Sequence, residues 1–460
     1  MKRIEFIWKS GLGLGGVLLS PTILESCRKK NPMEDIQFKG TVGIVGAGVA
    51  GLYAAYLLKT YGVNVELFEA TDRIGGRVRS LEGFTDFKID LGAEEIHGDK
   101  SIWYDLVRTK NPLFIDTENQ QDYYFVNGQL QAGNTFESGP EFAQIQNLLN
   151  SVYNYSGSDI SAAAYANSQG LPASLYSIWN ALAANENGTD ATRIGMAGLA
   201  FGYDNWSAGE KDYLVSNLDM HGILMSVFSS VTGNVRLNTP IEKIAYGSGK
   251  VKLTTANGEW IEKDRVIVTS SINVLFDQLI EFVPQLPSSH LQAIGTLGMG
   301  AGMKVILKFE NGFWAADTGS IIGDGPVPEF WTTAAGGRSA QNNLLTALVQ
   351  GQNAEDLLAL GEEMIPAILQ QLDAMYGNNV ATNSYVDHYV MNWGNEPFIR
   401  GTYSYNKPDT SPDARALLSE PVMNKLWFAG EACNSKGHHA TVHGAIESAL
   451  AAVEKILLTP

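Results

Sequence analysis

Cysteine is almost absent from this chain of 460 residues, which contains only Cys27 and Cys433. Two cysteines exclude a disulfide framework and a four-cysteine zinc site. Basic residues are also scarce, since 32 Lys and Arg stand against 49 Asp and Glu, for a formal net charge of −17. This balance argues against nucleic-acid binding, which needs fields of Lys and Arg. It is compatible with a cationic small-molecule substrate.

The first 27 residues differ in composition from the rest of the chain. They combine a basic start, an apolar stretch at residues 11–19 and a small-residue end, the layout of a secretory signal peptide. Residues 24–27 resemble the end of a bacterial lipoprotein signal, in which the cysteine becomes lipidated. We therefore expect an exported protein, periplasmic or held at a membrane through Cys27, with residues 28–37 as a linker. A plain cleaved signal or an uncleaved cytoplasmic tail is the alternative.

A glycine-rich motif follows the linker. The pattern around it predicts a strand, a helix and a second strand, at residues 42–45, 50–61 and 63–68. Gly46 permits a tight turn, Gly48 lets a pyrophosphate approach the backbone, and Gly51 allows the helix to pack closely on the strand. The helix N-terminus at Val49 and Ala50 offers free N–H groups and a positive dipole to phosphates. In this context the motif predicts a dinucleotide site.

The second strand leads to further residues suited to a nucleotide. It ends at Glu69 and Ala70, and the carboxylate can hydrogen-bond a ribose diol while disfavouring a 2′-phosphate. Arg73 and Arg77 bracket the sequence R-I-G-G-R, in which the arginines suit phosphate contacts and Gly76 permits close approach of a ligand to the backbone. This run resembles the R-x-G-G-R of the FAD-dependent amine oxidase superfamily, and the resemblance indicates FAD rather than NAD.

Six more motifs in the order of that family carry the same resemblance. They are similar to motifs of polyamine oxidases, monoamine oxidases and lysine-specific histone demethylases, and occupy residues 92–98, 234–241, 300–309, 393–405, 426–431 and 440–445. The resemblance adds to the predicted FAD contacts Gly92, Ala93, Val235, Gly430, Glu431, Thr441 and Val442. Thr402 stands where monoamine oxidases have their flavin-linking cysteine, so the resemblance implies non-covalent FAD.

The resemblance also implies a reaction. Hydride passes from the carbon beside an amine to the flavin, the imine hydrolyses, and O2 or another acceptor reoxidises the flavin. Lys304 would hold a water against the reacting edge of the flavin, and Tyr403 would form an aromatic wall beside the amine. Thr441 stands where monoamine oxidases have a second tyrosine, and His97 is a candidate for the cavity or flavin rim. We expect these four residues to form the catalytic site.

The substrate class depends on residues 92–98. L-amino-acid oxidases of this fold typically place an arginine in this segment to hold the substrate carboxylate, whereas this chain has Glu94 and Glu95. An acidic lining favours a polyamine or another small cationic amine, and we expect Glu94, Glu95 or both to attract it. The alternatives are an L-amino-acid oxidase that uses another arginine such as Arg193, an enzyme of this fold acting on a non-amine, and a flavin-binding protein with degenerate catalysis.

Two other features carry less information. His439 and His443 are four residues apart and could share a helix face, but no acid–histidine signature accompanies them, so no metal site is predicted. Cys433 is expected to be an inert buried thiol. The sequence does not indicate an oligomeric state.

Together these motifs predict an α/β fold with two domains. A discontinuous, Rossmann-type FAD-binding domain takes residues 38–100, 225–298 and 394–460. A mixed-sheet α+β substrate-binding domain takes residues 101–224 and 299–393. Helical patterns occupy residues 142–153 and 171–185, and residues 354–376 predict one amphipathic helix. No motif identifies the role of residues 119–220.

Overall fold

The computed structural model describes residues 36–117, 120–339, 341 and 343–460. The predicted signal segment with Cys27 lies outside the described residues. Within the described part of the chain, no helix has the combined length and apolarity that crossing a membrane requires.

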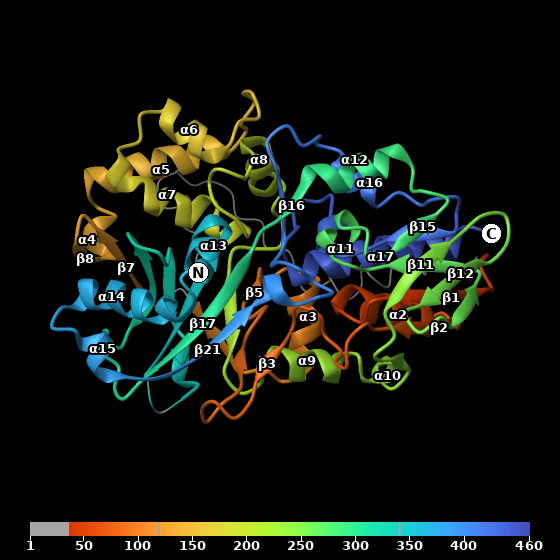
Figure 1. Ribbon diagram of the computed structural model, residues 1–460, viewed down its shortest axis with the longest axis horizontal. Coiled ribbons are helices and arrows are strands. Elements are labelled where there is room, and N and C mark those ends of the chain that lie inside the picture. The colour runs from red at the N-terminus through yellow and green to blue at the C-terminus, as the bar shows by residue number, and fades with distance from the viewer. Residues whose placement is uncertain (1–35, 118–119, 340, 342) are drawn as a thin grey trace, which may run out of the picture.

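A five-stranded parallel sheet forms one end of the molecule, at the right of Figure 1. Its strands, in spatial order, are β10 (Val235–Arg236), β2 (Asn64–Phe68), β1 (Thr41–Val45), β14 (Arg265–Val268) and β23 (Leu426–Phe428). The apolar run of β1 is fully covered because helices lie on one face and a second sheet on the other. Ile44 faces the helices α2 (Val49–Thr60) and α17 (Val442–Leu458), whereas Val45 faces the second sheet.

The second sheet has four strands in the order β13-β12-β11-β15. Their bounds are β11 (Ile241–Ala245), β12 (Val251–Thr255), β13 (Trp260–Lys263) and β15 (Glu281–Val283). Ile244 and Leu253 are fully buried against the five-stranded sheet. These layers hold the carboxyl ends of β1, β2 and β14 at one edge, where open α/β sheets bind their ligands.

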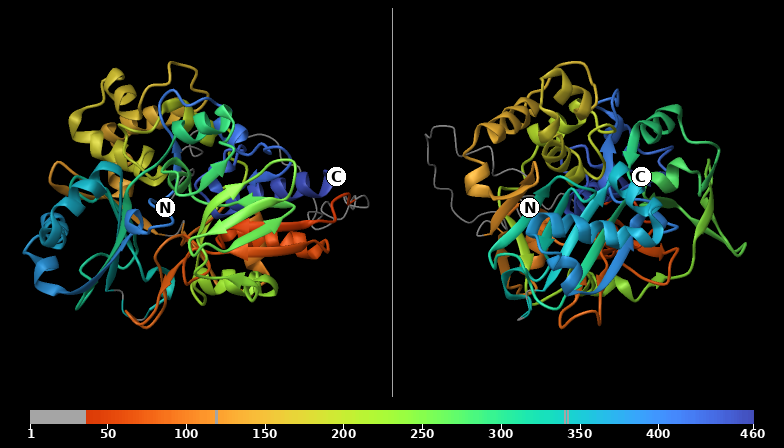
Figure 2. Two further views of the ribbon diagram at one scale, coloured as in Figure 1. Left: turned by 45° about the vertical axis from the view of Figure 1, so that its right-hand side comes forward. Right: turned by 60° about the vertical axis from the view of Figure 1, so that its left-hand side comes forward.

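A seven-stranded mixed sheet forms the other end of the molecule (Figures 1 and 2). Its strands, in spatial order, are β21 (Tyr385–Asn392), β17 (Gly302–Phe309), β20 (Leu344–Gln350), β19 (Glu329–Thr332), β18 (Thr318–Gly323), β7 (Gln121–Val126) and β8 (Gln129–Ala132). The apolar face of α14 (Met364–Tyr376) packs against one face of this sheet. Another cluster of helices packs against the opposite face of β7 and β18: α5 (Pro140–Val152), α6 (Ala162–Ser168), α7 (Tyr176–Ala183) and α8 (Met196–Asp204).

The single helix predicted for residues 354–376 is wrong. The chain forms α13 (Gly351–Ala359) and α14, joined by a short 3₁₀ turn. Gly361 takes a positive φ of 57°. Pro366 has no N–H to continue an α-helical ladder from the residues before it, so the proline lies in the first turn of a new helix.

The strands of the three main sheets follow the predicted division of the chain, although the domain boundaries themselves remain a prediction. A smaller sheet links the two parts: β5 (Ile96–His97) pairs with β9 (Asp212–Val215), which also pairs with β6 (Phe114–Asp116). This pairing brings the segment after the R-I-G-G-R loop against the part of the chain that carries no motif.

Candidate functional site

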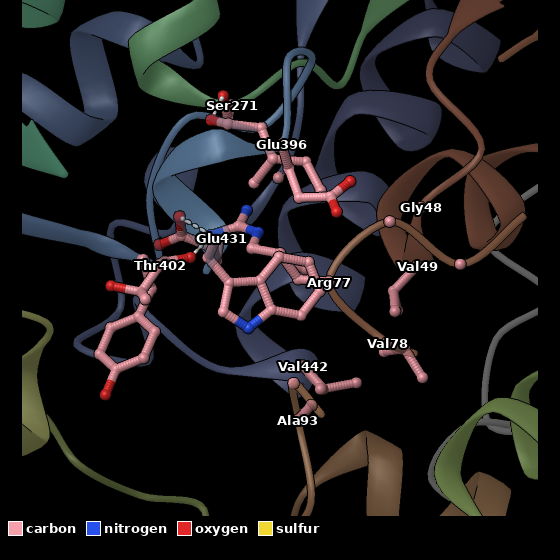
Figure 3. Close-up of a pocket in the computed structure, with 18 of the residues that line it drawn as sticks. Gly48, Val49, Arg77, Val78, Ala93, Ser271, Glu396, Thr402, Glu431 and Val442 are labelled. Atoms are coloured by element: carbon pink, nitrogen blue, oxygen red, sulfur yellow. Dashed lines mark hydrogen bonds and ion pairs between the residues drawn. The ribbon is translucent and has the colours of Figure 1, made fainter. Parts of the chain in front are cut away.

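A cavity of about 580 Å³ extends from the carboxyl edge of the five-stranded sheet to the seven-stranded sheet. Figure 3 shows Gly48 and Val49 on one side of it and Thr402 and Glu431 on another. Fifteen of the seventeen predicted FAD-contacting residues line this cavity. The exceptions are Gly51 and Val235.

The glycine motif forms the floor of one end of the cavity. Gly46 adopts a φ of 103°, and Gly48 begins α2 without any side chain capping the helix. The first N–H groups of α2, at Val49 and Ala50, therefore face the cavity as donors for an anion. A Cβ on Gly51 would lie 2.0 Å from the Gly46 carbonyl oxygen, which confirms close helix–strand packing at this glycine.

Glu69 is held in a fixed orientation at the end of β2. Its Oε2 accepts a hydrogen bond from the Ala47 N–H at 2.8 Å, and its Oε1 accepts from the N–H and hydroxyl of Thr71. The carboxylate lines the cavity beside Ala70. The structure thus places an oriented acid where the ribose contact is predicted, and the contact itself stays a prediction.

The two arginines of the R-I-G-G-R loop line the cavity, each beside a glutamate. Arg77 donates from Nη1 to Glu431 Oε1 at 2.9 Å and to the Thr402 carbonyl oxygen at 2.7 Å (Figure 3). Arg73 Nη2 lies 3.8 Å from Glu396 Oε2. Burial opposes ionisation of Glu431, but Arg77 and a buried arginine behind it hold the pKa of this carboxyl below its ordinary value.

The C-terminal signature closes this part of the cavity. Thr441 caps α17 by accepting a hydrogen bond from the Gly444 N–H, so Val442 stands in the first turn of a helix that begins at the cavity wall. With the uncapped α2, the glycine turn and the two arginines, the donors present fit an anionic dinucleotide such as FAD. Val235 lies on β10 away from this cavity, whereas Ile241, at the start of β11, lines it.

Lys304 lies on β17 and reaches the cavity from the seven-stranded sheet. Its Nζ donates to Glu94 Oε2 at 2.8 Å and to the Asp90 carbonyl oxygen at 3.2 Å, and it lies 5.0 Å from the centre of the Trp331 ring. Arg338 Nη1 donates to the other Glu94 oxygen at 2.9 Å. The expectation that Glu94 attracts a substrate cation is therefore wrong, because both of its oxygens already pair with buried cations.

Tyr403 and the residues around it form a polar and aromatic wall. The Tyr403 hydroxyl donates to the Glu186 carbonyl oxygen at 3.0 Å and lies 3.3 Å from Gln350 Nε2. Gln350 in turn accepts from the Thr402 hydroxyl at 2.8 Å. Trp331 also lines the cavity. The structure brings Tyr403 and Lys304 to the same cavity, as predicted.

His97 lies opposite Asp212 in the pairing of β5 with β9. Its Nδ1 is 3.2 Å from Asp212 Oδ1 and 4.0 Å from Glu95 Oε2. One ligand atom from each of these residues falls within 4.8 Å of the others, a grouping that could hold a cation. His439 and His443 do not share a helix face, because α17 begins after Thr441 and His439 precedes that cap.

The far end of the cavity is acidic. Glu186 and Ser320 line this end. The Ser320 hydroxyl donates at 3.0 Å to Oε1 of Glu329, which is buried behind the cavity wall. Glu329 is 1% exposed, and no donor among the described residues reaches its Oε2. Burial, with a contribution from the nearby Glu186, raises the pKa of Glu329 to about 8.

Sequence reasoning missed Arg338, Trp331, Gln350, Glu186 and Glu329. Glu329 is a lone acid in an apolar strand, a signal that could have identified it. Nothing local marks Arg338 as the partner of a glutamate 244 residues away. Cys433 is 6% exposed, which confirms that its thiol is buried, and burial raises the pKa of this thiol to about 12. Its lack of reactivity stays a prediction.

Comparisons with known proteins agree with this geometry. The family model for flavin containing amine oxidoreductases matches residues 224–457, just over half of the chain. A model for NAD(P)-binding Rossmann-like domains matches residues 44–109. Polyamine oxidase 4 of Oryza sativa subsp. japonica is 26% identical over 97% of this chain and 92% of its own length. Lysine-specific histone demethylase 2 of Homo sapiens is 24% identical over 90% of this chain and 53% of its own length.

Solved structures show the same fold. A putrescine oxidase bound to putrescine superimposes with a TM-score of 0.79 at 19% identity, covering 92% of this chain and 100% of the other. Cyclohexylamine oxidase from Brevibacterium oxydans IH-35A superimposes with a TM-score of 0.75 at 20% identity, covering 91% of this chain and 100% of the other.

Proposed function

Because the chain belongs to the flavin containing amine oxidoreductase family and oxidises amines with FAD, we propose that its substrates are aliphatic diamines or polyamines. Amine oxidation requires a site in the cavity that binds an amine. The charges that line the cavity support a substrate with more than one ammonium group.

The charge balance of the cavity carries this proposal. Seven glutamates line it, against three basic residues, Arg73, Arg77 and Lys304. Each of these three has a glutamate partner within the described part of the chain. A substrate carboxylate would therefore compete with existing ion pairs, whereas an ammonium group would meet the lining glutamates Glu95 and Glu186, behind which the Glu329 carboxyl is buried.

The sheet register sets the reach of such a substrate. Lys304 lies opposite Leu348 on β20, and Leu348 lies opposite Glu329 on β19. Two strand spacings separate the Cα atoms of Lys304 and Glu329, which is about 10 Å. An extended aliphatic diamine can thus place one nitrogen near Lys304 and the other toward the acidic end.

Bound FAD supplies the hydride acceptor of the reaction. The chain's own residues bind and orient the amine: Tyr403 and Trp331 offer aromatic side chains to a cation. Lys304 presents an N–H donor that we assign to the reacting edge of the flavin rather than to amine binding. His97, beside Asp212 and Glu95, offers a second polar contact in the cavity.

Two finer features of the reaction are also part of the proposal. Thr402 has no thiol, so we expect the FAD to be non-covalent and to leave the protein on acid precipitation. Flavin that stays with the precipitated chain would contradict this expectation. We expect O2 to reoxidise the flavin with release of H2O2, which a peroxide assay during amine turnover would detect.

The N-terminal segment supports a proposal about location. A lipidated Cys27 would hold the protein at a membrane on the exported side, and Cys27→Ser would release it as a soluble protein. Mass spectrometry of the mature N-terminus and membrane fractionation test this. A soluble protein that retains residues 1–26 would contradict both export and lipidation.

The acidic end can be tested separately from the reaction. Glu186→Gln combined with Glu329→Gln removes the Glu186 carboxylate and the buried Glu329 carboxyl without adding bulk. The KM values are compared at pH 9, because the pKa of Glu329 is raised to about 8 and its carboxyl is charged there. A lost charge-assisted contact of about 1.5–3 kcal/mol raises the KM for a diamine roughly 10- to 100-fold. The KM for a monoamine of equal chain length is the internal control and should change less than about threefold. Equal increases for both substrates would contradict the proposed role of these acids.

A further inference from the structure

Glu94 and Glu95 are neighbours in the sequence, line the same cavity, and have different partners. Glu95 lies beside His97. Glu94 is 6% exposed and pairs with two cations that are themselves buried, Lys304 at 2.8 Å and Arg338 at 2.9 Å. Burial opposes ionisation of Glu94, but Lys304 and Arg338 hold its pKa below the ordinary value.

Arg338 holds the Glu94 carboxylate in place independently of Lys304. Arg338 is anchored by its Nε, which donates to the Val215 carbonyl oxygen at 3.0 Å, and its Nη1 holds Glu94 Oε1. The remaining oxygen, Oε2, accepts from Lys304. A lysine side chain has a flexible stem, so a fixed acceptor is what gives its ammonium one position.

We propose that Glu94 is a positioning residue for Lys304, with Arg338 as its anchor. Two of the three ammonium N–H groups are used by Glu94 and by the Asp90 carbonyl oxygen. One N–H remains for a group in the cavity, beside the Trp331 ring. The inference rests on the proposed function, because it requires that Lys304 acts at the flavin. It assigns the two glutamates different roles: Glu94 acts through Lys304, and Glu95 acts on the substrate.

The Asp90 side chain makes this cluster sensitive to pH. Asp90 accepts hydrogen bonds from the Ser80 hydroxyl and the Met220 N–H, and it lies in the field of Arg338 and Glu94. Burial is the largest cause that raises the pKa of Asp90 to about 7; Arg338 opposes this and Glu94 adds to it. Removing the Glu94 charge should therefore lower the pKa of Asp90.

A double-variant cycle tests the positioning role. Stopped-flow absorbance follows anaerobic flavin reduction by a diamine in the wild type, Glu94→Gln, Lys304→Met and the double variant. We expect Glu94→Gln and Lys304→Met each to slow the limiting rate of flavin reduction, or the rate of flavin reoxidation by O2 measured separately, at least about tenfold. In steady-state assays, the KM for the diamine should change less than threefold. The double variant should be no more than about twofold slower than Lys304→Met alone, because both residues act through one ammonium. Multiplied effects in the double variant would overturn the proposal.

Glu95→Gln is the matched control. It removes the neighbouring carboxylate, which lies beside His97, and keeps the ion pair of Glu94 with Lys304. Because we assign Glu95 to the substrate, we expect a raised diamine KM and a limiting rate within about twofold of the wild type. A slower limiting rate in Glu95→Gln, or an effect of Glu94→Gln on KM alone, would overturn the division of roles. We expect the titration of Asp90 to give the reduction rate a step near pH 7 in the wild type. This step should move to lower pH in Glu94→Gln, and an unmoved step would also count against the proposal.

Two measurements keep the test independent of amine turnover. Reoxidation by O2 of the photoreduced FAD-loaded protein needs no amine, so it reports on Lys304 even if no diamine is a substrate. Thermal unfolding of the FAD-loaded variants reports on the ion pairs. Glu94→Gln leaves Lys304 and Arg338 as buried cations beside a neutral amide. Adding Lys304→Met removes one of these cations, so the double variant should unfold at a higher temperature than Glu94→Gln alone. Further loss of stability in the double variant would contradict the pairing. If Glu94→Gln does not fold, Glu94→Asp keeps the charge, and partial slowing is expected from it.

Discussion

The two ends of the cavity are built in different ways. At the nucleotide end, the local backbone shapes much of the cavity wall, through a glycine turn, an uncapped helix N-terminus and a glutamate held by an N–H 22 residues away in the sequence. At the amine end, side-chain charges meet from segments 210 and 244 residues apart. The first end depends on the absence of Cβ atoms at a few positions, and the second depends on the balance of buried charges.

The difference predicts that the two ends fail differently when they are mutated. A change in the glycine turn should remove the cofactor and lower stability together. A change in the charged end should leave the cofactor bound and alter rates, KM or pH dependence.

The largest effect is expected at Gly51. In Gly51→Ala the new Cβ would lie 2.0 Å from the Gly46 carbonyl oxygen, a backbone atom that cannot move without opening the turn. We expect a loss of about 3 kcal/mol or more in the free energy of unfolding and little bound FAD. Denaturant unfolding and the flavin content of the purified protein measure both. Gly249→Ala is the control, since a Cβ there meets nothing within 4 Å; normal FAD binding by Gly51→Ala would refute the packing role.

A smaller effect is expected from pH at the acidic end. Because the pKa of Glu329 is about 8, its carboxyl is mostly neutral at pH 7 and charged at pH 9. A charged carboxylate binds an ammonium group better, so the KM for a diamine should fall by a few-fold as pH rises through 8. The same profile for Glu329→Gln should lack this step. A diamine KM that rises over this range in the wild type would contradict the assignment.

The smallest effect is expected at Arg193. The structure places it away from the cavity, where it pairs with Glu355 at 2.7 Å and Asp190 at 3.1 Å. The expectation that it could hold a substrate carboxylate is therefore wrong. A half-exposed pair of this kind is worth about 0.2–1 kcal/mol, so Arg193→Ala should leave kcat/KM within about twofold. A larger loss, specific to amino-acid substrates, would revive the amino-acid oxidase alternative.

The same contrast explains what the sequence could predict. The strand–glycine turn–helix unit was predicted closely, as β1, α2 and β2, because each glycine acts on its near neighbours in the chain. Lys304 and Tyr403 were placed at the cavity through the family resemblance. The role of Glu94 was missed because its identity as an acid says nothing about Arg338, which only the folded chain brings to it.

Residues 119–220 show the same limit. They contribute β9, which places Asp212 beside His97, and they contribute Glu186 to the acidic end. Neither contact leaves a local pattern, since a single acid in a polar segment is usually a solvated surface residue. Substrate recognition is therefore the part of the function that depended most on the structure.

The most direct test of the central claim is anaerobic mixing of the FAD-loaded protein with matched amines. The series compares putrescine and spermidine with butylamine, which has one ammonium group, and with L-leucine, which adds a carboxylate. The account predicts that the flavin is bleached at the lowest concentrations by the di- and polyamines, more weakly by butylamine, and not by L-leucine. Bleaching by L-leucine with none by putrescine or spermidine would contradict it.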